Sequence, residues 1–117
     1  MFRAQIKTIL SVFLIAAYAF SLVHAEPLMA KVSVLASGKL LLDGSPADLA
    51  SIESEFKRLQ RENGVVWYYR ENAQAEPSSE ATAVVQLVNK YNLPISMSSK
   101  PDFSDFIDEA GRSRPRK

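Results

Sequence analysis

The sequence has no cysteine and a single histidine, His24, among its 117 residues. The absence of cysteine excludes disulfide bonds, thiolate nucleophiles, CxxC redox pairs and cysteine-based zinc sites, as well as the lipid-modified cysteine of a bacterial lipoprotein. A large charge of one sign is also lacking, because 14 Lys and Arg stand against 13 Asp and Glu, for a formal net charge of +1. This balance argues against a nucleic-acid binder that works by neutralising phosphates. The length allows one domain.

The first 25 residues have the pattern of an export signal. Arg3 and Lys7 precede an uncharged apolar run at residues 9–23, and Val23 and Ala25 are small residues at the positions that a signal peptidase prefers. The run is shorter than the roughly 20 residues that span a bilayer. We therefore expect a signal peptide at residues 1–25, cleaved after Ala25, and a periplasmic or secreted protein. The alternative is an uncleaved anchor, which the same positive charges would orient with its C-terminus outside.

Cleavage after Ala25 changes what chemistry the chain can carry. Two basic residues and the only histidine leave, so the remaining 92 residues have 12 basic and 13 acidic side chains and a net charge of −1. Without His and Cys, neither a Ser-His-Asp nor a Cys-His unit can form, nor the usual zinc or copper site. We predict a protein that is not an enzyme and has no cofactor and no metal site.

Periodicity predicts most of the elements that follow. A hairpin is expected over residues 31–43, and Asp43-Gly44 then ends its second strand. A helix follows, with Ser45 as its cap and Pro46 at its first position, and Asn63-Gly64 ends it. An apolar stripe at helical spacing runs along it: Leu49, Ile52, Phe56 and Leu59.

The second half repeats a strand and a helix. Residues 65–69 (VVWYY) are β-branched or aromatic throughout and predict an interior strand. A polar loop at residues 71–79 leads to a second helix, which runs from about Pro77 or Ser78 to Tyr91, and Pro94 prevents its continuation. Residues 95–98 alternate and predict a short last strand. Residues 102–110 could add a helical turn, and the basic residues 111–117 predict a disordered tail.

The order strand, strand, helix, strand, helix, strand predicts the fold class α+β. Helices of this length allow right-handed crossovers, and a single apolar stripe on each helix places both on one face of a four-stranded sheet. We therefore predict a two-layer β-β-α-β-α-β sandwich, formed by one domain at residues 26–110.

This pattern resembles the periplasmic domain of the ExbD/TolR biopolymer-transport family. The matching pieces cover about 70 residues and include the strand and turn at residues 39–44 (KLLLDG), the helices and the strands at 65–69 and 93–97. The resemblance implies a related fold in the same compartment. Family members keep an acidic residue in an uncleaved membrane helix, whereas residues 9–23 contain no Asp or Glu, so the resemblance does not support proton-driven energy transduction. No functional residue of the family carries over.

The aromatic residues of the interior strand give the candidate surface. Trp67 and Tyr69 are expected in the core under the helices, with Tyr68 on the opposite face; the alternative is an aromatic platform for a carbohydrate or peptide. Helices on one side leave the other sheet face open, and a short edge strand can accept a partner strand. We predict a partner-binding surface that includes Leu41 and Tyr68.

Three groups of polar residues are candidate sites. The carboxylates at residues 102–109 could form a calcium site or a hydrolase pair, but a solvated acidic face explains them better. The basic tail could attract anionic lipid or nucleic acid weakly, and solubility or processing explains it better. Ser96, Ser98, Ser99 and Lys100 lack the spacing of a serine–lysine catalytic pair.

The sequence thus predicts an exported, non-enzymatic binding or assembly module of the cell envelope with a protein partner. The alternative is a membrane-anchored accessory subunit of an ExbD/TolR-like transport complex. We expect no nucleic-acid partner, and membrane contact only if residues 1–25 are retained.

Overall fold

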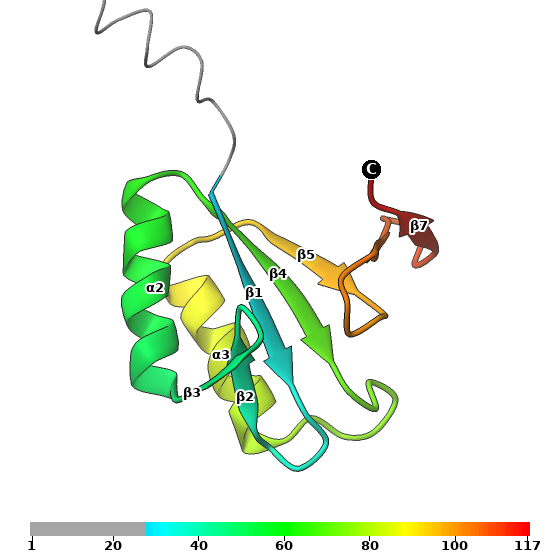
Figure 1. Cartoon of the computed structure of the whole chain (residues 1–117), viewed down its shortest axis with the longest axis horizontal. Helices are drawn as coiled ribbons and strands as arrows, with labels where there is room; N and C mark the ends of the chain where they lie inside the picture. The colour runs from blue at the N-terminus through cyan, green and yellow to red at the C-terminus, as the bar shows by residue number, and fades with distance from the viewer. Residues whose placement is uncertain (1–27) are drawn as a thin grey trace, which may run out of the picture.

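The computed structural model describes residues 28–117, so the predicted signal peptide lies outside the described residues. Two helices cover one face of a five-stranded sheet, and a two-stranded sheet follows at the C-terminus (Figure 1). The helices are α2 (Leu49–Arg61) and α3 (Ser79–Lys90). The strands are β1 (Met29–Val34), β2 (Leu40–Leu42), β3 (Ser45–Ala47), β4 (Val65–Arg70), β5 (Ile95–Ser98), β6 (Asp105–Ile107) and β7 (Ser113–Pro115).

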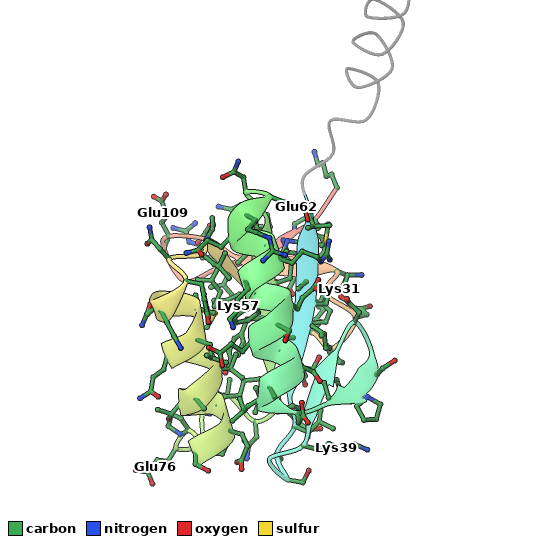
Figure 2. The ribbon with its side chains drawn as sticks, turned by 90° about the vertical axis from the view of Figure 1, so that its left-hand side faces the viewer. Lys31, Lys39, Lys57, Glu62, Glu76 and Glu109 are labelled. Carbon is green, nitrogen blue, oxygen red and sulfur yellow. The ribbon has the colours of Figure 1, made fainter. Side chains whose placement is uncertain are left out.

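The larger sheet has the strand order β3-β2-β1-β4-β5. β1, β4 and β5 are parallel and are joined through α2 and α3, whereas β2 and β3 are antiparallel additions. The predicted α+β sandwich with both helices on one face is therefore confirmed. Figure 2 shows α2 and α3 side by side in front of the sheet.

The sheet has a fifth strand because Asp43 and Gly44 form a turn rather than ending the hairpin. Both have positive φ, 51° and 86°, as a two-residue type I′ turn requires, and Ser45 then pairs with Leu42. The helix therefore begins after β3. Its cap is Asp48, whose carboxylate accepts a hydrogen bond of 2.8 Å from the amide of Ser51, and not Ser45 as the sequence predicted.

The core lies between the helices and the sheet. Ile52, Phe56 and Leu59 of α2 are fully buried, as predicted. The prediction is wrong for Leu49, which is 36% exposed at the start of the helix. From the sheet, the residues of β1 and β4 that face the helices complete it: Ala30, Val32, Val34, Val66 and Tyr68. α3 adds Ala81, Val84 and Val88.

The predicted orientation of β4 is wrong. Tyr68 faces the helices and is 3% exposed, whereas Trp67 and Tyr69 lie half-buried on the other face. Tyr68 pairs with Val32 of β1, which also faces the helices. The large ring of Trp67 does not need the helices for cover, because the C-terminal segment packs against it.

That C-terminal segment, residues 99–117, is ordered, so the predictions of a helical turn at 102–110 and a disordered tail at 111–117 are also wrong. β6 and β7 pair as a hairpin. Asp108 stabilises its turn, since one carboxylate oxygen accepts hydrogen bonds from the amides of Ala110 and Arg112, each 2.9 Å long. Gly111 completes the turn with a φ of 79°. The segment lies on the side of the sheet opposite the helices (Figure 1).

Candidate partner-binding surface

β5 is an edge strand with unused main-chain hydrogen-bonding groups. It pairs with β4 on one side, and within residues 28–117 no strand pairs with it on the other. The amide of Val66 donates to the carbonyl of Pro94 at 2.9 Å. Because successive residues of a strand present their N–H and C=O groups to alternate sides, those of Ile95 and Met97 point away from β4. The edge therefore offers two donors and two acceptors to an added strand.

Apolar side chains accompany this edge. Ile95 and Met97 are 39% and 44% exposed, and Val85 of α3 is 38% exposed. Between α3 and β5 lies a groove of about 320 Å³ with a mainly apolar lining: Tyr68, Arg70, Pro77, Ala81, Thr82, Val85, Gln86 and Met97. We call this groove together with Ile95 the β5 edge surface. It combines main-chain hydrogen bonding with apolar contacts, which is what recognition by strand addition requires.

Arg70 is the one charged residue of this groove, and its guanidinium is already engaged. It donates to the carbonyls of Ala73 and Ala75 at 2.6 Å and 3.0 Å. Arg70 thereby closes the loop that leads to α3 at one end of the groove. The rest of the lining is neutral, so the surface suits an apolar segment better than a charged one.

The opposite edge of the sheet is protected. β3 has three residues, and Pro46 at its centre has no N–H to donate. Short edge strands and edge prolines are the usual means of preventing strand addition. β5 contains no proline and no charged residue, so it lacks the edge proline of β3.

The sheet face opposite the helices, which we call the second sheet face, is partly covered by the C-terminal segment. The ring centroid of Phe103 lies 6.5 Å from that of Trp67 and 6.4 Å from that of Tyr69. The ammonium of Lys31 lies 5.6 Å from the Trp67 centroid, and the guanidinium carbon of Arg116 lies 3.8 Å from it. The open sheet face that the sequence predicted is thus partly covered by this chain.

A buried carboxylate holds the C-terminal segment together. Asp105 is 2% exposed and accepts hydrogen bonds from the hydroxyls of Ser99 and Ser113 at 2.5 Å and 2.6 Å, and from the Ser99 amide at 3.0 Å. Burial raises the pKa of Asp105, but the hydrogen bonds from Ser113, Ser99 and the Lys100 amide outweigh burial and lower it to about 2. Asp105 is therefore an ionised, structural residue.

The other predicted acidic residues do not join it. Asp108 is paired with Arg114 at 2.9 Å, and Asp102 accepts from the amide of Ser104. Within the part of the chain that the structure describes, no three His, Cys, Asp or Glu side chains are grouped so that they could hold a metal ion. The carboxylates near the C-terminus serve turns and ion pairs.

The structure does not bring the two predicted surface residues together. Leu41 lies half-buried on the second sheet face, in register with Ser33 and Pro46. Tyr68 lies in the core and contributes to the lining of the groove between α3 and β5. Burial raises the pKa of its hydroxyl. The prediction that Tyr68 shares an exposed face with Leu41 is wrong; Tyr69, not Tyr68, shares that face.

Sequence reasoning missed Ile95, Met97 and Val85 as surface residues. One signal could have found two of them, because the alternation in residues 95–98 puts Ile95 and Met97 on one side of the strand and Ser96 and Ser98 on the other. Their exposure depends on β5 being an edge strand, which is a property of the sheet order.

Comparison with known proteins adds no relative: no family model matches the chain, and no curated protein matches it. The resemblance to the ExbD/TolR family stays a prediction. Neither helix in residues 28–117 is long and apolar enough to cross a bilayer.

Proposed function

We propose that this chain is an exported, non-enzymatic binding or assembly module of the cell envelope, and that its protein partner adds a strand to the edge of β5. The observation that carries the proposal is the unprotected edge at Ile95 and Met97, beside an apolar groove. Export rests on the pattern of residues 1–25, and the absence of Cys and His after Ala25 supports a non-enzymatic role.

The groups exposed at the edge of β5 indicate what kind of partner segment would fit there. An added strand would exchange main-chain hydrogen bonds with Ile95 and Met97, and these bonds are the same for any sequence. Specificity then comes from alternate side chains, which meet the groove between α3 and β5. Since the described lining is neutral apart from the engaged Arg70, the partner segment is extended, with apolar residues at alternate positions.

A photo-crosslinking amino acid at position 97 tests this proposal in the cells that make the protein. We expect a discrete adduct from position 97 and none from position 49, because Leu49 is a comparably exposed apolar residue at the start of α2, outside the groove lining. Ile95→Lys should abolish the adduct. Adducts of equal yield from both positions, or an adduct that survives Ile95→Lys, would count against strand addition at β5.

A membrane-anchored accessory subunit of an ExbD/TolR-like complex is the second candidate, favoured by the uninterrupted apolar run at residues 9–23. N-terminal sequencing of the exported protein separates the two. A start at Glu26 rules out the anchor, and an intact N-terminus in the membrane fraction rules out the cleaved signal.

A further inference from the structure

The guanidinium of Arg116 lies in a cradle on the second sheet face. Its carbon is 3.8 Å from the centroid of the Trp67 ring, the distance of a stacked cation–π contact. Its Nη2 donates to the hydroxyl oxygens of Ser96 and Ser98, each at 3.0 Å, and its Nε donates to the carbonyl of Phe103 at 3.1 Å. One face of the group is covered and three acceptors meet its edge.

The acceptors are oriented by the fold and not by Arg116. The hydroxyl of Ser98 donates to the carbonyl of Asp105 at 2.9 Å, so its lone pairs are left to accept. Ser96 is placed on the same face of β5 by the strand's alternation, and the register sets it beside Trp67. The cradle is thus built from β4, β5 and the start of the C-terminal segment.

This geometry is selective for guanidinium over ammonium. A planar fork matches several acceptors at its edge while its face stacks on an indole, whereas a lysine ammonium offers no face and no fork. The three contacting acceptors are all neutral. Burial lowers the pKa of Arg116 and the charge of Asp105 opposes this, so the group stays ionised without a carboxylate in contact.

The contacts of the Arg116 side chain are separate from those that hold the hairpin together. The three residues of β7 that precede Arg116 are all exposed. Its amide donates one hydrogen bond to the carbonyl of Ser104. The rest of the segment is held separately by the hydrogen bonds of Asp105 and by the ring of Phe103, so the hairpin can remain in place when the Arg116 guanidinium is displaced.

We propose that Trp67, Ser96, Ser98 and the Phe103 carbonyl form a binding site for an arginine side chain of a partner polypeptide, which Arg116 occupies until the partner displaces it. Trp67, Ser96 and Arg116 are all half-buried, so solvent reaches the site. The site does not depend on strand addition, because Ile95 and Met97 face the other side of β5. An arginine is the ligand because the site already holds one through three hydrogen bonds and a cation–π contact.

Trp67 is the only tryptophan of the chain, so its fluorescence reports on the cradle directly. The test uses the full chain with Arg116→Ala and the probe N-acetyl-arginine methylamide. We expect the variant's emission to be shifted to longer wavelength and the probe to reverse the shift saturably. If Arg116 occupies the site at least nine-tenths of the time, wild type should need at least about ten times as much probe for the same response.

Three controls make the result specific. N-acetyl-lysine methylamide should bind several-fold more weakly, and Arg114→Ala should leave the Trp67 spectrum unchanged because Arg114 pairs with Asp108. Ser96→Ala together with Ser98→Ala in the Arg116→Ala background should weaken the arginine probe. Circular dichroism confirms folding, and Arg116→Lys carries the same titration if Arg116→Ala does not fold. Equal binding of the two probes, or no saturable response to the arginine probe, would overturn the proposal.

Discussion

Trp67 and Tyr68 are adjacent in β4, and their side chains lie on opposite faces of the sheet. Tyr68 packs beneath the helices, whereas Trp67 contacts Arg116 and Phe103. The sheet is thus covered on both faces around β4, by two helices on one side and by the chain's own C-terminal segment on the other. Ile95 and Met97, at the edge of β5, stay exposed in this arrangement.

The two faces predict different responses to truncation. Tyr68→Ala removes a buried ring from the core and should lower the free energy of unfolding by about 3 kcal/mol or more. Leu41→Ala removes a half-buried side chain on the second sheet face, and it should lower the free energy of unfolding by half as much or less. Urea denaturation measures both. Equal losses would contradict the burial of Tyr68 beneath the helices.

Gly64 marks a close approach between the end of α2 and the start of β1. A Cβ at this position would lie 2.5 Å from Cδ2 of Leu59 and 2.9 Å from the carbonyl oxygen of Leu28. We expect Gly64→Ala to destabilise the fold by about 1–3 kcal/mol through overpacking.

A double-mutant cycle checks the cause of that loss. Leu59→Ala removes the closest atom, so the double variant should be more stable than the sum of the single losses predicts. Additive losses would show that Leu59 is not the obstacle.

Asp105 predicts a pH dependence of stability. Its pKa in the folded protein, about 2, lies below the ordinary value of 3.8, so ionised Asp105 stabilises the folded state. This contribution is present in full above about pH 4 and is lost as the pH falls through 2. Asp105→Asn should lower the free energy of unfolding at pH 7 by about 1–3 kcal/mol, because buried hydrogen bonds lose their charged acceptor.

The matched control for Asp105 is Glu109→Gln, a change at an exposed carboxylate in the same hairpin. Thermal denaturation at pH 7, 4 and 2 measures the melting temperature. Between pH 4 and 2 the melting temperature should fall less for Asp105→Asn than for wild type. The Glu109→Gln curve should follow wild type. If the melting temperature of Asp105→Asn falls with pH as steeply as that of wild type, carboxylates other than Asp105 dominate acid denaturation.

The helices could be predicted because their signals are local. Ile52 and Phe56 are four residues apart on one stripe, and Ser78 caps α3 by accepting from the amide of Ala81 three residues later. Such patterns need no knowledge of the rest of the chain. The β-α-β order then follows from the sequence of elements.

The remaining features depend on contacts between distant residues. Residues 65–69 are apolar on both faces, so alternation alone does not say which side meets the helices. The C-terminal hairpin depends on Asp105 meeting Ser99 and Ser113, and an isolated aspartate gives no sign of either partner. The candidate surface was misplaced at Tyr68 for the same reason, since the edge position of β5 comes from the strand order.

Amide hydrogen exchange of β5 in the unmodified protein, with and without the partner that crosslinking identifies, tests strand addition most directly. The account predicts that exchange at Ile95 and Met97 slows on binding, because their N–H groups gain acceptors in the added strand. Exchange at Val66, whose amide is already bonded to Pro94, should change little. If the partner instead protects residues elsewhere and leaves Ile95 and Met97 unchanged, β5 is not the binding edge.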